Sequence, residues 1–146
     1  MRSIRGSLPL LAVALLAVTA SANPQTKKLS GPLVRDGLGD VYAHVLSPDG
    51  ARAVYRASHD DPQALDLYSV PVDGSAPAVR LNPPLVAGGN VEWPPLFSPD
   101  SSRVVYVADQ DVDGMLELYS VPLAGGTVVK LNAPLIPAGD VGSPGP

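Results

Sequence analysis

The sequence predicts an all-β fold made of four-stranded antiparallel sheets arranged in tandem. Two observations predict it: a long internal repeat, and short β-branched segments separated by turn residues. The stretch from Leu46 to Val91 reappears from Phe97 to Val141, with a period of about 50 residues. The 146 residues include 17 Pro and 14 Gly, a density of turn formers that suits short strands rather than long helices.

Each repeat divides into four segments of strand-like sequence with turn residues between them. The first segment runs into Ser-Pro-Asp, which suits a tight turn, and a β-branched run follows. In the third segment, where residues alternate, we expect the leucines and valines to face one side of the sheet and the acidic and polar residues the other. The expected strands are 42–46, 52–55, 65–70 and 78–81 in the first repeat, and 93–97, 103–107, 116–121 and 128–131 in the second.

Four short antiparallel strands in a repeat of this length form a β-propeller blade. A partial third copy, residues 28–34, matches residues 130–136, so the mature chain is expected to begin on a fourth strand. The expected organisation is a signal peptide (1–22), a linker with a partial outer strand (23–40), blade 1 (41–82), an inter-blade loop with blade 2 (83–132), and the truncated start of a next blade (133–146).

The repeated motif is Leu/Phe-Ser-Pro-Asp, then a β-branched strand, then Asp/Glu-Leu-Tyr-Ser-Val-Pro. It resembles the WD40-like repeat of TolB-type β-propellers and of the propeller domains of prolyl-oligopeptidase-type enzymes. The resemblance covers residues 41–131. It implies a propeller fold and, from the TolB-type members, protein partners in the cell envelope.

The N-terminus reads as a secretory signal peptide. Arg2 and Arg5 form a basic start, residues 8–18 are apolar, and Ala20-Ser21-Ala22 is a small-residue cleavage motif. The apolar run is shorter than the roughly 20 residues that cross a bilayer. We therefore predict cleavage after Ala22, a periplasmic or secreted protein, and no membrane span after cleavage.

Composition and charge exclude several classes of function. The net charge is −4, and without a basic stripe nucleic acid is not an expected partner. There is no cysteine, which excludes disulfides and thiolate catalysis. The sequence holds no Gly-x-Ser-x-Gly motif and no acid, histidine and serine set that we can nominate. We therefore expect no catalytic residue, no enzymatic activity and no cofactor.

Asp109, Asp111 and Asp113 precede Gly114 with the spacing that opens a calcium-binding loop. The rest of that pattern is missing, because Ser120 stands where such a loop places its bidentate Glu and the flanks read as strands. A solvated hairpin tip is the preferred interpretation. Calcium binding by these three residues remains the alternative.

Two further residue pairs have structural interpretations. Asp49 and Asp100 each follow Ser-Pro in a turn, where the side chain accepts hydrogen bonds from backbone amides. His44 and His59 have no matching histidine in the second repeat, so neither a metal site nor a catalytic base is expected from them.

Tyr42, Trp93 and Asn90 are the candidate partner-binding residues. Tyr42 and Trp93 occupy matched positions near the first strand of each repeat, and Asn90 belongs to the loop 86–90. Aromatics at a loop edge can anchor a protein partner. The preferred interpretation of the two aromatics is packing between adjacent blades.

Two blades are fewer than the four to eight that typically close a propeller. We favour a fragment of a longer propeller, because nothing polar caps the last repeat; the alternatives are a ring closed by several copies and a short stack of blades. The expected function is that of an exported module for protein binding or scaffolding. Two alternatives stay open: the N-terminal propeller part of an exported prolyl-oligopeptidase-type peptidase, and a calcium-stabilised structural repeat.

Overall fold

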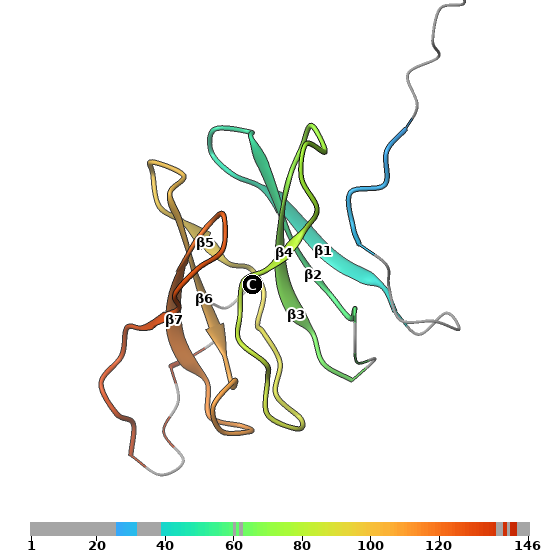
Figure 1. The fold of residues 1–146 in the computed structure, drawn as a ribbon. Helices are drawn as coiled ribbons and strands as arrows, with labels where there is room; N and C mark the ends of the chain where they lie inside the picture. The colour runs from blue at the N-terminus through green and yellow to red at the C-terminus, as the bar shows by residue number, and fades with distance from the viewer. Residues whose placement is uncertain are drawn as a thin grey trace, which may run out of the picture.

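The protein folds into two four-stranded antiparallel sheets that lie side by side (Figure 1). The structure, a computed structural model, describes residues 26–31, 39–59, 61, 63–136, 139 and 141–142. Each sheet keeps its strands in chain order, so each is a meander of the propeller-blade type. The strands are β1 (Val41–Leu46), β2 (Arg52–Ala57), β3 (Asp66–Pro71) and β4 (Val79–Arg80) in blade 1, and β5 (Leu96–Phe97), β6 (Arg103–Ala108), β7 (Glu117–Pro122) and β8 (Val129–Lys130) in blade 2.

The all-β fold and the four strands per repeat are confirmed, but three strands are shorter than predicted. β4 and β8 cover two residues each where we expected 78–81 and 128–131, and β5 is shortened most. β5 covers only Leu96–Phe97, whereas we expected a strand over 93–97. The difference follows from Pro94 and Pro95, which have no backbone N–H to donate to β6. Trp93 therefore lies before the strand, while its counterpart Tyr42 lies inside β1.

The expected grouping of leucines and valines on one side of the third strand is wrong. In β3 the register pairs Leu67 with Arg56 and Val70 with Ala53, so the two apolar side chains point to opposite faces. Period-two alternation requires this, because they are three residues apart. Asp66 and Ser69 are buried as well, so neither face of β3 is the solvated side that we expected.

Each blade thus has two distinct faces, which we name by their residues. The leucine face of blade 1 carries Val45, Val54, Arg56, Leu67 and Ser69, and that of blade 2 carries Leu96, Val105, Val107, Leu118 and Ser120. The tyrosine face of blade 1 carries Leu46, Ala53, Tyr55, Tyr68 and Val70, and that of blade 2 carries Phe97, Val104, Tyr106, Tyr119 and Val121.

The main core lies between the blades. It joins the leucine face of blade 1, through Val54 and Leu67, to the tyrosine face of blade 2, through Tyr106 and Tyr119. Leu81, just after β4, belongs to the same core. The blades therefore stack head to tail, with unlike faces in contact.

The segment between the blades holds this arrangement by backbone hydrogen bonds. The Val91 amide donates to the Leu65 carbonyl over 2.9 Å, and the Glu92 amide donates to the Val107 carbonyl over 2.8 Å. The carbonyl of Val91 also accepts a hydrogen bond from Arg56 of blade 1 over 3.0 Å. One short stretch thus bonds to both sheets and sets their relative position.

A second, smaller core covers the tyrosine face of blade 1. Tyr55, Ala57, Tyr68 and Val70 form it, and Leu29 from the N-terminal segment packs against it. Figure 1 shows this blue segment, residues 26–31, running beside blade 1 on the side away from blade 2. Leu29 thus covers blade 1 as Leu81 covers blade 2.

The predicted signal peptide, 1–22, lies outside the described residues, as does part of the linker 23–40. Within the described part of the chain there is no helix long and apolar enough to cross a membrane.

Candidate protein-interaction surface

The three aspartates of the proposed calcium loop point to different partners. Asp109 accepts hydrogen bonds from the amides of Asn90, over 2.6 Å, and Gly114, over 3.0 Å. Asp111 pairs with Lys130 at 2.7 Å, and Asp113 lies against Gly88. Among the described residues no group of three or more His, Cys, Asp or Glu is arranged to hold a metal ion. In this structure Asp109 and Asp111 hold the loop in place through the amides of Asn90 and Gly114 and through Lys130.

Of the three candidate partner-binding residues, Tyr42 is the exposed one. Trp93 is partly buried and packs against the core between the blades, as in the packing interpretation. The Asn90 side chain accepts a hydrogen bond from the Leu65 amide over 3.1 Å and donates one to the Gly88 carbonyl over 2.9 Å. Trp93 and Asn90 thus fix the inter-blade segment, and Tyr42 stands apart from them on β1.

The Ser-Pro-Asp turns are built as the sequence suggests. Asp49 accepts hydrogen bonds from the Ser47 hydroxyl and the Ala51 amide, which lower the pKa of its carboxyl. Asp100 accepts the matching bonds from Ser98 and Ser102, and these lower its pKa to about 2. Both carboxylates hold turns, so they are not poised as acids at neutral pH.

His59 takes part in an aromatic stack on the tyrosine face of blade 1. Its ring stacks on Tyr68 with 4.0 Å between centroids, and Tyr68 stacks on Tyr55 at 5.4 Å. At the matched position of blade 2, Gln110 accepts a hydrogen bond from the Tyr106 hydroxyl over 2.9 Å. His59 and Gln110, each two residues after the second strand of its blade, therefore both contact the tyrosines. A search for matched polar residues in the two repeats, rather than for a second histidine, would have found this pair.

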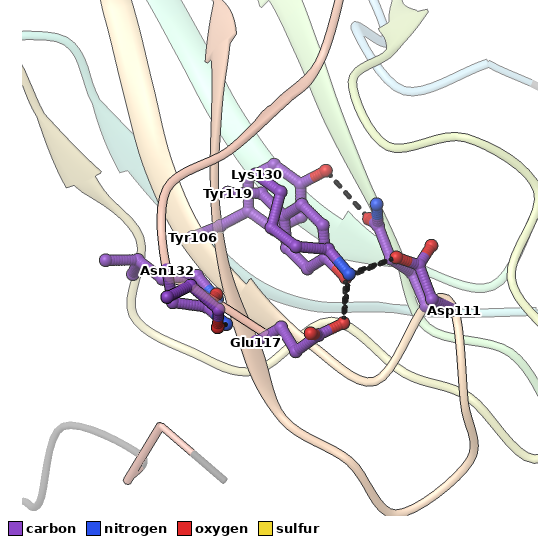
Figure 2. Close-up of polar contacts among 9 residues, drawn as sticks. Tyr106, Asp111, Glu117, Tyr119, Lys130 and Asn132 are labelled. Carbon is purple, nitrogen blue, oxygen red and sulfur yellow. Dashed lines mark hydrogen bonds and ion pairs between the residues drawn. The ribbon is translucent and has the colours of Figure 1, made fainter. Parts of the chain in front are cut away.

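A polar cluster that sequence analysis missed lies at the edge of the tyrosine face of blade 2 (Figure 2). The Lys130 ammonium lies 2.7 Å from a carboxylate oxygen of Asp111 and 2.7 Å from one of Glu117. The Tyr119 hydroxyl donates to Glu117 over 2.9 Å and lies 3.1 Å from Asp111. These contacts join the loop after β6 to β7 and β8.

Electrostatics assign this cluster a structural role. Burial and then the hydrogen bond to Glu117 raise the pKa of Tyr119, and the two carboxylates raise the pKa of Lys130. Burial opposes ionisation of Glu117, but hydrogen bonds from Lys130 and Tyr119 outweigh it and lower its pKa. At neutral pH the tyrosine is thus a neutral phenol and the lysine an ammonium ion, so neither is an activated nucleophile or base.

Blade 1 holds the same kind of cluster in weaker form. Arg80 lies 3.8 Å from Asp66, and Asn82 donates a hydrogen bond to Asp66 over 2.6 Å. The acidic residue and the basic residue occupy matched positions in both repeats. That matched pairing of opposite charges on the third and fourth strands is the signal that sequence analysis overlooked.

The most prominent surfaces are the two sheet faces that have no blade against them. We call the face of blade 1 that has no blade against it the open tyrosine face; the side chains at its centre are buried in the smaller core, and it exposes Val41, Leu46 and Val72. We call the uncovered face of blade 2 the open leucine face; it exposes Leu96, Val129 and Leu131. Large apolar side chains that gather on one face commonly mark a binding surface.

Both open faces are hollowed. A cavity of about 180 Å³ on the open leucine face is lined by Pro94, Leu96, Val105, Leu118 and Val141, among others. A cavity of about 260 Å³ on the open tyrosine face is lined by Leu29, Val41, His44, Ala53, Tyr55 and Val70, together with Ser30. The linings are mainly apolar, so both hollows suit apolar side chains of a partner rather than a charged small molecule.

Comparison with solved structures finds several chains that are similar to this one. A solved structure of an Agrobacterium tumefaciens protein assigned as TolB aligns with a TM-score of 0.49 and 27% sequence identity. The alignment covers 65% of this chain and 34% of that one, so the matched part is about a third of the solved structure's length. No protein-family model matches the chain, and no curated protein matches it.

Proposed function

We propose that this chain is an exported propeller module that binds proteins through its open sheet faces and has no catalytic activity of its own. The observation that carries the proposal is the exposure of apolar residues on both open faces. Their counterparts in the other repeat are buried, or packed against the core, where the two blades meet. Burial of such surface is the main driving force of protein association. Leu46 and Leu96 are its most exposed members.

The charge and the ionisable groups support the same function. The net charge of −4 opposes binding to phosphate backbones. The cluster around Lys130 keeps Tyr119 neutral and Lys130 charged at neutral pH, which is a structural rather than a catalytic arrangement. A protein is therefore the partner whose chemistry fits these faces.

Site-specific crosslinking tests the binding function. A photo-crosslinking amino acid is placed at Leu96, at Leu46, or at Val112 as a control, since Val112 is exposed on a loop outside both faces. We expect protein adducts at positions 96 and 46 in the cell envelope, and few or none at 112. Absence of adducts at both faces, or equal yields at all three positions, would overturn the proposal.

Export is tested separately. The proposed periplasmic or secreted location rests on the signal sequence, and the mature protein is expected to begin at Asn23. Fractionation followed by mass spectrometry of the intact chain measures both. An unprocessed chain retained in the cytoplasm would remove export from the proposal and leave the binding function to the crosslinking result.

A further inference from the structure

We propose that the open leucine face of blade 2 binds the open tyrosine face of blade 1 in a second copy of this chain. The two blades would then stack between copies as they stack within one copy. This inference deepens the proposed function, on which it rests, by naming the partner. The repeat places matched residues once between the two blades and once on an open face.

On the leucine face, matched residues differ sharply in exposure. Leu81 is 2% exposed between the blades, and its counterpart Leu131 is 48% exposed. Val45 packs against the inter-blade core, and its counterpart Leu96 is 63% exposed. The side chains that fill the interface within the chain therefore recur on blade 2 with no blade to contact.

The tyrosine face shows the reverse pattern at three matched positions, while the residues at its centre are buried in both blades. Val91 is fully buried between the blades, and its counterpart Val41 is 40% exposed. Phe97 packs against the inter-blade core, and its counterpart Leu46 is 54% exposed. Val72, exposed on blade 1, likewise matches the buried Leu123 of blade 2. One chain thus exposes one face of each kind. The core between its two blades shows that a leucine face packs well against a tyrosine face.

The open leucine face is better suited to binding than its internal counterpart in one respect. Arg56 of blade 1 lies in the internal interface, and its buried Nε atom has no hydrogen-bond partner in the described structure. At the matched position blade 2 carries Val107, which pairs with Leu118 on the open face. Contact between copies would therefore avoid the cost of burying an unpaired polar atom there.

The connection after blade 2 is already set for a following blade. The Val141 amide donates to the Leu116 carbonyl over 2.8 Å, as the Val91 amide donates to the Leu65 carbonyl over 2.9 Å. Before blade 1, the Ser58 amide donates to the Asp40 carbonyl over 3.2 Å, in the manner of Asp109 and Asn90. The same junction thus recurs at each end of the two-blade unit.

The contact joins unlike faces, so its symmetry is head to tail. Such contacts form a ring when the rotation closes and a filament when it does not. Propellers close with about four to eight blades, so a closed ring would need about two to four copies of a two-blade chain. A discrete small oligomer is therefore the expected product.

The N-terminal segment competes with the second copy. Leu29 packs on the tyrosine face of blade 1 where Leu81 packs on that of blade 2, and Lys27 donates a hydrogen bond to the Gly74 carbonyl. Leu131 of an incoming copy would need the place of Leu29. Residues 26–31 must therefore move aside for the copies to stack, and Leu29→Ser is expected to lower the dissociation constant several-fold. The double variant Leu29→Ser with Leu46→Asp controls for unspecific adhesion and should stay monomeric.

A mixing experiment tests the interface on the full chain. Leu96→Asp blocks the open leucine face, Leu46→Asp blocks the open tyrosine face, and Val112→Asp is the matched exposed control. A carboxylate at either face would be buried without a partner, so we expect the dissociation constant to rise at least about 100-fold. Circular dichroism checks that each variant keeps its β-structure; Leu131→Asp and Val72→Asp replace any that does not.

The masses from sedimentation velocity decide the outcome. The unaltered chain and Val112→Asp should form a discrete oligomer of two to four copies, and each blocked variant alone should be a monomer. A one-to-one mixture of the blocked variants should form a dimer, because one intact face of each kind remains. A monomeric unaltered chain, a blocked variant that still associates, or a mixture that stays monomeric would overturn self-association. Crosslinks from positions 46 and 96 to a different protein would then leave the proposed binding function standing.

Discussion

Blade 1 and blade 2 have nearly the same strands but turn opposite faces toward each other. In blade 1 the leucine face meets the other blade, and the centre of the tyrosine face is buried in a separate core against which Leu29 packs; in blade 2 the tyrosine face meets the other blade. Leu67 is therefore fully buried while its counterpart Leu118 is only partly so. The position of the neighbouring blade, rather than the residue itself, decides how much each side chain contributes to stability.

The polar clusters of the two blades also differ in their contacts. In blade 2, Lys130 bridges two carboxylates at 2.7 Å each. In blade 1, Arg80 lies 3.8 Å from a single carboxylate, Asp66, and Asn82 supplies the closer contact. Blade 2 thus relies on a charged network at its outer edge, and blade 1 relies on a buried amide.

Removing one leucine from each blade should show the largest difference. Leu67→Ala opens a cavity in the inter-blade core and should lower the free energy of unfolding by about 2–5 kcal/mol. Leu118→Ala, at the matched position on the open face, should lower it by about 1 kcal/mol or less, because less surface is lost from the core. Urea unfolding at a concentration where the chain is monomeric measures both. Equal losses would mean that the two blades do not bury opposite faces in solution.

Lys130→Gln should weaken blade 2 and change its response to acid. Hydrogen bonds from Lys130 help to lower the pKa values of Asp111 and Glu117 below their ordinary values of 3.8 and 4.5. A carboxyl group whose pKa is lowered by folding stabilises the folded state at pH values above its pKa in the unfolded chain. This contribution is lost as the pH falls through its pKa in the folded chain. The variant should lose about 1 kcal/mol at pH 7, discounted for partial exposure.

The shape of the pH profile is the sharper test. Stability of the unaltered chain should fall as pH drops below about 4.5, and the fall should be shallower in the Lys130→Gln variant because the two pKa values return toward their unfolded values. Arg80→Gln in blade 1 is the matched control and should change the profile less. Parallel profiles for all three proteins would contradict the role assigned to Lys130.

Exchanging the turn residues between blades tests a smaller difference. Gly50 has φ of 68° and Ser101, its counterpart, has φ of 56°, the region that favours glycine. Gly50→Ser should therefore cost about 1 kcal/mol. Ser101→Gly should increase the free energy of unfolding by less than that amount, because it removes the Ser101 hydroxyl that accepts a hydrogen bond from the Asp49 amide. Thermal unfolding of the two variants measures the asymmetry, and a stabilised Gly50→Ser would refute it.

The smallest effect is expected from calcium. Asp109 is engaged by two amides and Asp111 by Lys130, so an added cation must displace the lysine. Differential scanning calorimetry with calcium and with chelator should therefore give the same melting curve. A rise in the melting temperature with calcium, absent in an Asp113→Asn variant, would restore the calcium-stabilised repeat as the better interpretation.

Much of the fold follows from local sequence. The repeat of Ser-Pro-Asp turns and β-branched runs predicts the order of the strands, and cross-strand pairing then follows from the short turns. The shortened β5 could also have been anticipated, because Pro94 and Pro95 stand inside the expected strand. The orientation of Leu67 and Val70 could also have been predicted. Because they are three residues apart in a strand, their side chains must point to opposite faces.

The sequence by itself thus determined the strands, their order, the turns and the two-fold repeat, because these depend on interactions between residues close in the chain. Only the tertiary structure decided which face of each blade is buried, that Leu29 covers blade 1, and that Lys130 joins Asp111 to Glu117. These features depend on which segments meet across long sequence separations. Two repeats with the same strand order therefore differ in burial because one has a blade against its leucine face and the other has a blade against its tyrosine face.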